Sequence, residues 1–203
     1  MTTTETSATV TPTIALRRIE RAQIVVPIQG TAPLIVHRFD EKAKEMMLEA
    51  QQQKTRTKKA AKDPVACYKA SMYRFTDGGH GFPAVGFKAA MVDSARLFDG
   101  VKMTELRAAL TVIGDGPEQL IRITSDTPRM REDTVRVGMG TADLRYRAEY
   151  WPWSAELTIN FVPSMLSAES VVAIVDAAGI GGIGEWRPSK AKTGSYGTFE
   201  VAP

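Results

Sequence analysis

Hydrophobic and polar residues alternate over several short stretches of the chain, and this pattern predicts a protein rich in β-strands. Residues 19–36 carry many β-branched side chains and are interrupted by Gly30 and Pro33, which predicts a long strand, a kink and a short extended continuation. The other predicted strands cover residues 106–113, 119–124, 129–137, 143–150, 154–162 and 198–201.

Three helices are predicted between these strands. Hydrophobic residues follow helical spacing over 41–53 and again over 85–97. Ser167 is a suitable N-cap for a third helix, which we expect to end at Gly179. Once the basic loop and the hairpin described below are set aside, the order is strand, helix, strand, strand, helix, strand. This order predicts an α+β protein of ferredoxin-like or RRM type, with an antiparallel sheet and helices on one face.

Two of the alternating runs, 129–137 and 143–150, are joined by a turn that contains glycine. They predict a β-hairpin inserted into the domain at 125–150. Every second residue of the later strand is apolar, so one face of the hairpin can pack, while we expect a polar face formed by Asp143, Arg145, Arg147 and Glu149.

The composition is that of an ordinary globular protein. The 203 residues are 43% hydrophobic and 24% charged, and we expect one domain over 14–203 after a disordered tail at 1–13. Cys67 is the only cysteine, which excludes an intramolecular disulfide and favours a reducing compartment; we expect it to be a small buried residue. No apolar run approaches the length of a membrane span, so we expect a cytoplasmic protein without membrane contact.

The positive charge is concentrated in one segment. The net charge is only +3, yet residues 54–62 hold five basic residues and no acidic one, which leaves 21 basic against 23 acidic residues elsewhere. We expect an exposed loop over 53–63 that either is simply solvated or binds phosphates. Its candidate binding residues are Lys54, Arg56, Lys58, Lys59 and Lys62.

Residues 179–184, Gly-Ile-Gly-Gly-Ile-Gly, match the G-x-G-x-x-G pattern of dinucleotide-binding loops. That function is disfavoured, because it requires a preceding strand and a following helix, whereas here a helix precedes and Trp-Arg-Pro follows. The segment is either a turn that ends the helix or a loop whose backbone amides approach a phosphodiester backbone while side chains stack and supply charge. The candidate residues are Gly181, Gly182, Gly184, Trp186, Arg187, Lys190, Lys192 and Tyr196.

The C-terminal helix, glycine pairs, basic spacer and final strand resemble the terminal glycine-rich loop of the RAMP superfamily, which supplies RNA-binding backbone subunits and guide-processing nucleases of CRISPR systems. Residues 32–39, Ala-Pro-Leu-Ile-Val-His-Arg-Phe, resemble that family's first strand and following loop. Residues 81–91, 130–147 and 179–188 also resemble a group of small phage and prophage proteins. The resemblance implies an RRM-like core whose inserted hairpin is a thumb, with copies that polymerise along a single strand.

Under this resemblance, the thumb would contact the nucleic acid. Met130, Val135 and Val137 would be available to wedge between bases. The residues available to hold phosphates would be Arg129, Arg131, Arg136, Arg145 and Arg147. Five acidic residues within 126–149 balance these arginines, so a solvated, salt-bridged hairpin or a subunit contact is an equally consistent interpretation.

Support for catalysis is limited to His37, which with Arg38 stands where the resembling nucleases carry general acid-base residues. No group of residues has metal-ligand spacing, and no cofactor is expected. We therefore expect a non-enzymatic, sequence-independent binder of single-stranded DNA or RNA that His37 and Arg38 help to contact. Copies would assemble into a filament or ring, with phage recombination or CRISPR-type subunits as further partners. The alternatives are a structural protein that assembles without nucleic acid and a metal-independent ribonuclease.

Overall fold

The computed structural model describes residues 16–39, 45, 47–49, 51–52, 61–137, 141–190 and 194–203. The predicted tail at 1–13 and most of the predicted basic loop lie outside these residues. Within the predicted helix at 41–53, the described residues Glu45, Met47–Glu49 and Gln51 are helical. No helix in the described part of the chain is both long and hydrophobic enough to cross a membrane.

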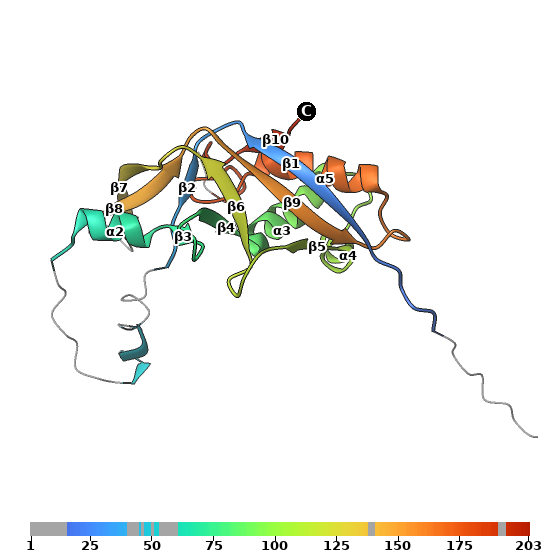
Figure 1. The fold of residues 1–203 in the computed structure, drawn as a ribbon, viewed down its shortest axis with the longest axis horizontal. Coiled ribbons are helices and arrows are strands. Elements are labelled where there is room, and N and C mark those ends of the chain that lie inside the picture. The colour runs from blue at the N-terminus through green and yellow to red at the C-terminus, as the bar shows by residue number, and fades with distance from the viewer. Residues whose placement is uncertain are drawn as a thin grey trace, which may run out of the picture.

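One antiparallel sheet organises the molecule (Figure 1). At its centre, β1 (Ala22–Gly30) pairs with β9 (Trp153–Phe161) from Ala22 opposite Phe161 to Gln29 opposite Ser154. The other edge of β1 pairs with β10 (Phe199–Val201). This arrangement places the strands predicted at 154–162 and 198–201 on either side of the first strand.

The remaining strands of this sheet lie beyond β9. β5 (Leu110–Ile113) and β6 (Leu120–Ser125) pair with opposite ends of β9, and β4 (His80–Pro83) and β3 (Tyr73–Arg74) continue the sheet from β6. The core strands therefore run in the order β10, β1, β9 and then β5 with β6. This is the ferredoxin-like order that the sequence predicts.

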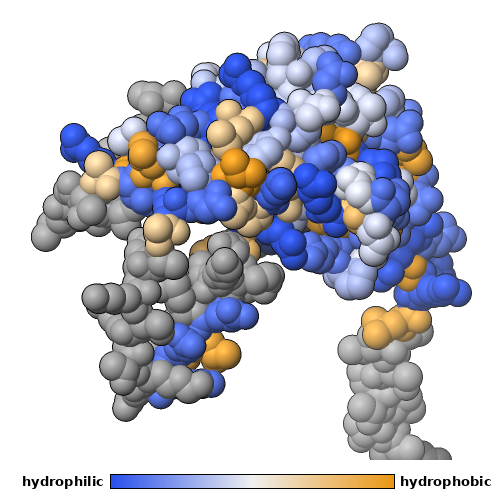
Figure 2. Space-filling view, turned by 60° about the vertical axis from the view of Figure 1, so that its left-hand side comes forward, coloured by the Kyte–Doolittle hydropathy of each residue, from blue (hydrophilic) through white to orange (hydrophobic). Residues whose placement is uncertain are grey.

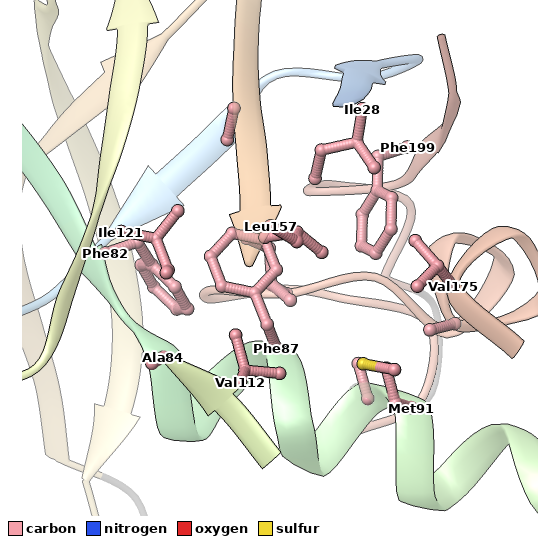
Figure 3. Packing of buried hydrophobic residues seen from close by; sticks show 14 of the residues in the cluster. Ile28, Phe82, Ala84, Phe87, Met91, Val112, Ile121, Leu157, Val175 and Phe199 are labelled. Carbon is pink, nitrogen blue, oxygen red and sulfur yellow. The ribbon is translucent and has the colours of Figure 1, made fainter. Parts of the chain in front are cut away.

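Helices cover one face of the sheet. α3 (Ala84–Asp93) continues into the short 3-10 turn η1 (Ser94–Leu97), and both pack against α5 (Ala168–Gly181). Alternate residues of β9 face this layer and are buried. In Figure 3, Phe87 of α3 lies against Leu157 of β9, and Met91 lies beside Val175 of α5. The hydrophobic alternation of the strand thus supplies one side of the core and the helices supply the other.

The predicted strand at 106–113 is wrong in its first half. Residues 103–109 form α4 (Met103–Ala109), and β5 begins only at Leu110. Leu106 and Ala109 are buried while the residues between them are exposed, which is the spacing of a helix and not of a strand. The segment is also rich in strong helix formers, which favours the helix.

α5 begins where the sequence predicts and ends later. The Ser167 hydroxyl caps it by accepting a hydrogen bond from the Ser170 N–H at 3.1 Å. The helix continues through Gly179 to Gly181. Gly179 therefore does not end the helix. Its role is in packing, because a residue without a side chain leaves room here for the backbone of Phe199 in β10.

The chain leaves the main sheet at Gly30 and enters a second, three-stranded sheet. The Trp153 indole fills the space that a Cβ on Gly30 would occupy, and its Nε1 donates a hydrogen bond to the Ala32 carbonyl at 2.9 Å. β2 (Leu34–Val36) then pairs with β8 (Thr141–Tyr150), which pairs with β7 (Arg129–Val137). The predicted kink and the predicted hairpin are both confirmed.

Candidate functional site

The β7–β8 hairpin is packed on both faces near its base. On one face lies α2 (Pro64–Ala70), together with Ser71, whose hydroxyl accepts a hydrogen bond from the Ala148 N–H at 2.9 Å. The Tyr68 hydroxyl donates to the Pro128 carbonyl just before the hairpin begins. The other face meets the segment that follows α5, which we call the glycine loop (residues 182–197).

An ion-pair network occupies the face towards the glycine loop. Glu149 accepts hydrogen bonds from Arg129 at 2.5 Å and from Arg131 at 2.9 Å, and Arg131 also donates to Asp133 at 2.7 Å. Burial alone would raise the pKa of Glu149, but the hydrogen bonds from the two arginines outweigh it and hold this pKa below its ordinary value. The interpretation of the hairpin as salt-bridged is therefore correct for its base, but the acidic partners there are buried and not solvated.

Arg147 corrects the prediction that its side of β8 faces solvent. It is 1% exposed, with Nη1 at 3.4 Å from Asp133 and Nη2 at 3.8 Å from Glu185. Its Nε has no hydrogen-bond partner among the described residues. Glu149, also predicted to be on the polar face, is 2% exposed. Both are buried because the glycine loop covers this face, so Arg147 does not reach a phosphate in this conformation.

The glycine loop is joined tightly to β2. The Glu185 N–H donates to the Ile35 carbonyl at 2.9 Å, and the Gly197 N–H donates to the Pro33 carbonyl at 2.8 Å. Gly184 has a φ of +76°, and a Cβ at this position would lie 2.5 Å from the Ile35 carbonyl oxygen. This glycine therefore allows close approach to the protein's own backbone, which differs from the predicted approach to a phosphodiester backbone.

The other predicted glycines also serve the fold. Gly181 is the last residue of α5, and Gly182 follows it with a φ of +66° close to the Gly197 carbonyl. Arg187 folds back on the loop and donates to the Gly184 carbonyl at 2.7 Å. Gly182 and Arg187 therefore contact the backbone of the glycine loop itself.

Two aromatic residues of the loop have different surroundings. The Tyr196 ring lies beneath the Arg131 guanidinium, whose carbon is 4.7 Å from the ring centroid, and the Tyr196 hydroxyl accepts a hydrogen bond from Arg131 at 3.1 Å. Trp186 has a φ of +56°, a conformation that is uncommon for a residue other than glycine, and its carbonyl accepts from the Tyr196 N–H at 3.2 Å. Its side chain is 38% exposed. Trp186 thus presents a ring to solvent, whereas Tyr196 binds the hairpin.

His37 lies where the end of β2 meets the glycine loop. Its Nδ1 is 4.0 Å from the Glu185 carboxylate, and its side chain is 32% exposed. Burial lowers the pKa of His37, and the charges of Arg147, Arg145 and Lys62 lower it further against the opposing charge of Glu185. The imidazole is therefore neutral near pH 7.

A pocket of about 340 Å³ opens beside His37. Lys62 pairs with Asp143 in its wall at 2.8 Å, and Arg38 pairs with Glu118 at 2.8 Å. Arg145 also lines the pocket and makes no ion pair with any described residue. Cys67 lines it too and is partly exposed, so the prediction that it is buried is wrong. The pocket brings together groups from the segment after β2, from β8, and from α2 and the residues beside it.

The other predicted contacts are not brought to this pocket. Met130 is 48% exposed on β7, and Arg136 and Lys190 are exposed as well. Val135 is partly exposed. The predicted binding residues Lys54, Arg56, Lys58, Lys59 and Lys192 lie outside the described residues.

Sequence reasoning counted Asp133 and Glu149 only as charges that balance the arginines of the hairpin, and it missed Glu185. Glu185 lies between His37 and Arg147, and Asp133 lies between Arg131 and Arg147. The hairpin prediction carried part of this signal, because the two strands pair with Glu149 opposite Arg129 in the structure. Glu185 had no such signal, since the glycine loop reaches the hairpin only in the folded chain. Figure 2 shows that the surface on the hairpin side is largely hydrophilic, with hydrophobic residues scattered among polar ones.

The fold is similar to solved structures, although no protein-family model and no curated protein matches the sequence. A chain of the cryo-EM structure of the Type III-B Cmr-beta complex bound to cognate target RNA is similar over 90% of this chain, with a TM-score of 0.51 and 8% identity. The match covers 59% of that chain, so this protein spans less than two thirds of its length.

A second similar structure is the crystal structure of Cmr6 from Pyrococcus furiosus. The similarity covers 91% of this chain and 100% of that one, with a TM-score of 0.45 and 11% identity. The match to the Cmr-beta chain shows the fold: this protein has a RAMP-like α+β fold, as the resemblance of its sequence implies.

Proposed function

We propose that this protein binds single-stranded nucleic acid, without sequence preference and without catalysis, where β2, the hairpin and the glycine loop meet. The observation that carries the proposal is the placement of Arg145, with no ion pair among the described residues, beside His37 in an open pocket. Trp186, next to Glu185 in the adjoining loop, adds an exposed ring of the kind on which bases stack.

The architecture supports RNA as the first strand to test. One protein chain with a similar fold belongs to a complex bound to target RNA. The hairpin side of this protein is mainly hydrophilic, which suits a charged polymer better than an apolar protein surface (Figure 2). The residue pattern does not distinguish RNA from DNA, so both strands belong in the experiment.

Fluorescence anisotropy with labelled single-stranded RNA and DNA tests this proposal. We expect binding that weakens as salt rises, and Arg145→Gln should weaken it and reduce the salt slope by roughly one released counterion. Arg107→Gln is the matched control, because Arg107 is an exposed residue on α4 outside the site. No binding of either strand at low salt would overturn the proposal.

Self-association along the strand is part of the proposal and has its own test. Electron microscopy with and without oligonucleotide separates the two expectations. Filaments or rings that form only with the strand support cooperative assembly on nucleic acid. Rings or tubes that form equally well without it favour the alternative of a structural assembly protein.

Metal-independent RNA cleavage is the second candidate function. The observation that favours it is His37, a partly exposed imidazole with Glu185 at 4.0 Å and the cation Arg145 in the same pocket. This candidate predicts RNA cleavage in the presence of a chelator that His37→Ala abolishes while strand binding persists. Intact RNA after incubation with the unaltered protein supports binding without catalysis.

A further inference from the structure

The pocket beside His37 adjoins an open strand edge. β2 ends at Val36, opposite Ala148, so residues 143–147 of β8 have no strand partner on that side among the described residues. Lys62 reaches across this edge and donates to the Leu144 carbonyl. The edge of β8 therefore borders the pocket, and Lys62 satisfies the Leu144 carbonyl there.

The pocket walls combine two kinds of surface. One set of lining residues is apolar or aromatic, and the other is polar and mainly cationic. The first set consists of Phe39, Met47, Cys67, Ala70 and Tyr146, and the second of His37, Arg38, Lys62, Ser71, Asp143 and Arg145. Aromatic rings accept stacked bases, and arginine and lysine accept phosphate, so the two sets together match the two halves of a nucleotide.

Among the described residues that line the pocket, Arg145 is a cation without an ion pair. Lys62 is neutralised by Asp143 at 2.8 Å, whereas Arg145 has no ion pair among the described residues. Arg147 is already paired with Asp133 and Glu185 and does not line the pocket, so Arg145 is the residue that offers its charge to a ligand here. The volume of about 340 Å³ lies at the lower end of the range for small-molecule sites, which fits a single nucleotide.

We infer that this pocket binds one nucleotide unit of the strand, with its base against the apolar and aromatic lining residues and its phosphate at Arg145 and His37. The inference rests on the proposed function for the source of the nucleotide, and it adds a specific site where one base leaves the stack of its neighbours. A free nucleoside monophosphate is the probe, because it carries both parts that the pocket recognises.

Cys67 provides the readout. It is the only cysteine of the chain and it lines the pocket, so its rate of alkylation by iodoacetamide reports occupancy. We expect adenosine or uridine monophosphate to slow alkylation several-fold, and inorganic phosphate or the nucleoside alone to slow it much less. An unchanged rate at saturating monophosphate would overturn the inference. Equal slowing by inorganic phosphate would also overturn it, since the site would then bind an anion without a base.

Variants separate the pocket from the rest of the surface. Ala70→Phe fills the space beside the apolar lining residues, and Arg145→Gln removes the cation that has no ion pair among the described residues. Both variants should abolish the protection of Cys67 by monophosphate. Arg107→Gln on α4 should keep it. If Ala70→Phe does not fold, Arg145→Gln carries the test, because Arg145 lies at the pocket surface.

Strand binding, measured by anisotropy on the same preparations, distinguishes the two proposals. If the protein binds RNA or DNA but neither the strand nor the monophosphate protects Cys67, the inference about the pocket is overturned and the proposed function stands. Protein that binds no strand while monophosphate protects Cys67 overturns the proposed function and leaves a mononucleotide site.

Discussion

Arg131 of β7 and Glu149 of β8 form an ion pair of 2.9 Å across the hairpin, with 25% and 2% of their side chains exposed. Arg131 also contacts Tyr196 through a hydrogen bond and its ring face. The same guanidinium therefore joins the two strands of the hairpin to each other and the hairpin to the glycine loop. The orientation of the hairpin depends on this buried polar contact as well as on hydrophobic packing.

Glu149→Gln tests the contribution of this contact to stability. The variant keeps the shape of the side chain and removes the charge that Arg129 and Arg131 share. We expect the free energy of unfolding to fall by about 2–3 kcal/mol, as for lost hydrogen bonds between charged groups. The loss stays below that of a stranded buried charge because Arg129 is 73% exposed and is hydrated when released. Urea unfolding measures it.

Glu156→Gln is the control for this prediction. Glu156 is exposed on β9 and has no ion pair with a described residue, so its substitution should change stability by less than about 0.5 kcal/mol. Equal stability of the two variants would show that the buried ion pairs contribute nothing net.

Gly184→Ala tests the close approach of the glycine loop to β2. The alanine Cβ would lie 2.5 Å from the Ile35 carbonyl oxygen and 2.8 Å from Leu34 Cδ1, in a backbone with φ of +76°. Gly116→Ala is the matched control, since Gly116 has a φ of +67° and open space around it. We expect roughly 1–2 kcal/mol of destabilisation from the positive φ alone at residue 116 and a clearly larger loss at residue 184. Thermal unfolding compares them.

Trp186 combines a strained backbone with an exposed ring, and two substitutions separate these properties. Trp186→Gly and Trp186→Ala both remove the ring, but only glycine relieves the φ of +56°. We expect the glycine variant to be more stable than the alanine variant by roughly 1 kcal/mol. Both should bind single strands more weakly by about 1–3 kcal/mol, the value of one base stacked on an aromatic ring. Unchanged affinity of both variants would remove Trp186 from the interface.

Much of the fold is readable from the sequence because strand periodicity acts locally. β9 and the hairpin alternate clearly, and the strand and helix order then leaves the ferredoxin-like arrangement as the simplest topology. α4 was missed because its Leu and Ala residues run directly into the apolar residues of β5, and the whole stretch was assigned to one strand.

The site was less predictable, for a physical reason. Whether a polar strand face is solvated depends on what packs on it, and the segment that buries Arg147 is the glycine loop, which follows it only after β9 and α5. His37, Lys62 and Arg145 likewise come from three separate segments that meet only in the folded chain. Counting charges along the sequence identified the basic residues of the site but not the acidic residues with which they pair.

His37→Gln tests the electrostatic environment of the pocket through pH. The pKa of His37 is lowered in the folded protein, by burial first and then by Arg147, Arg145 and Lys62, while the unfolded chain titrates near the ordinary value of about 6.5. Below that pH, His37 binds a proton in the unfolded chain but not in the folded protein. Acidification therefore favours unfolding until the pH falls below the lowered pKa of His37 in the folded protein. The other histidine, His80, is retained in both proteins, so its contribution to the pH dependence of stability cancels in the comparison. We therefore expect the stability of the unaltered protein, relative to His37→Gln, to fall between pH 7.5 and pH 5. Urea unfolding across this range measures it, and a difference independent of pH would contradict the burial of His37 among cations.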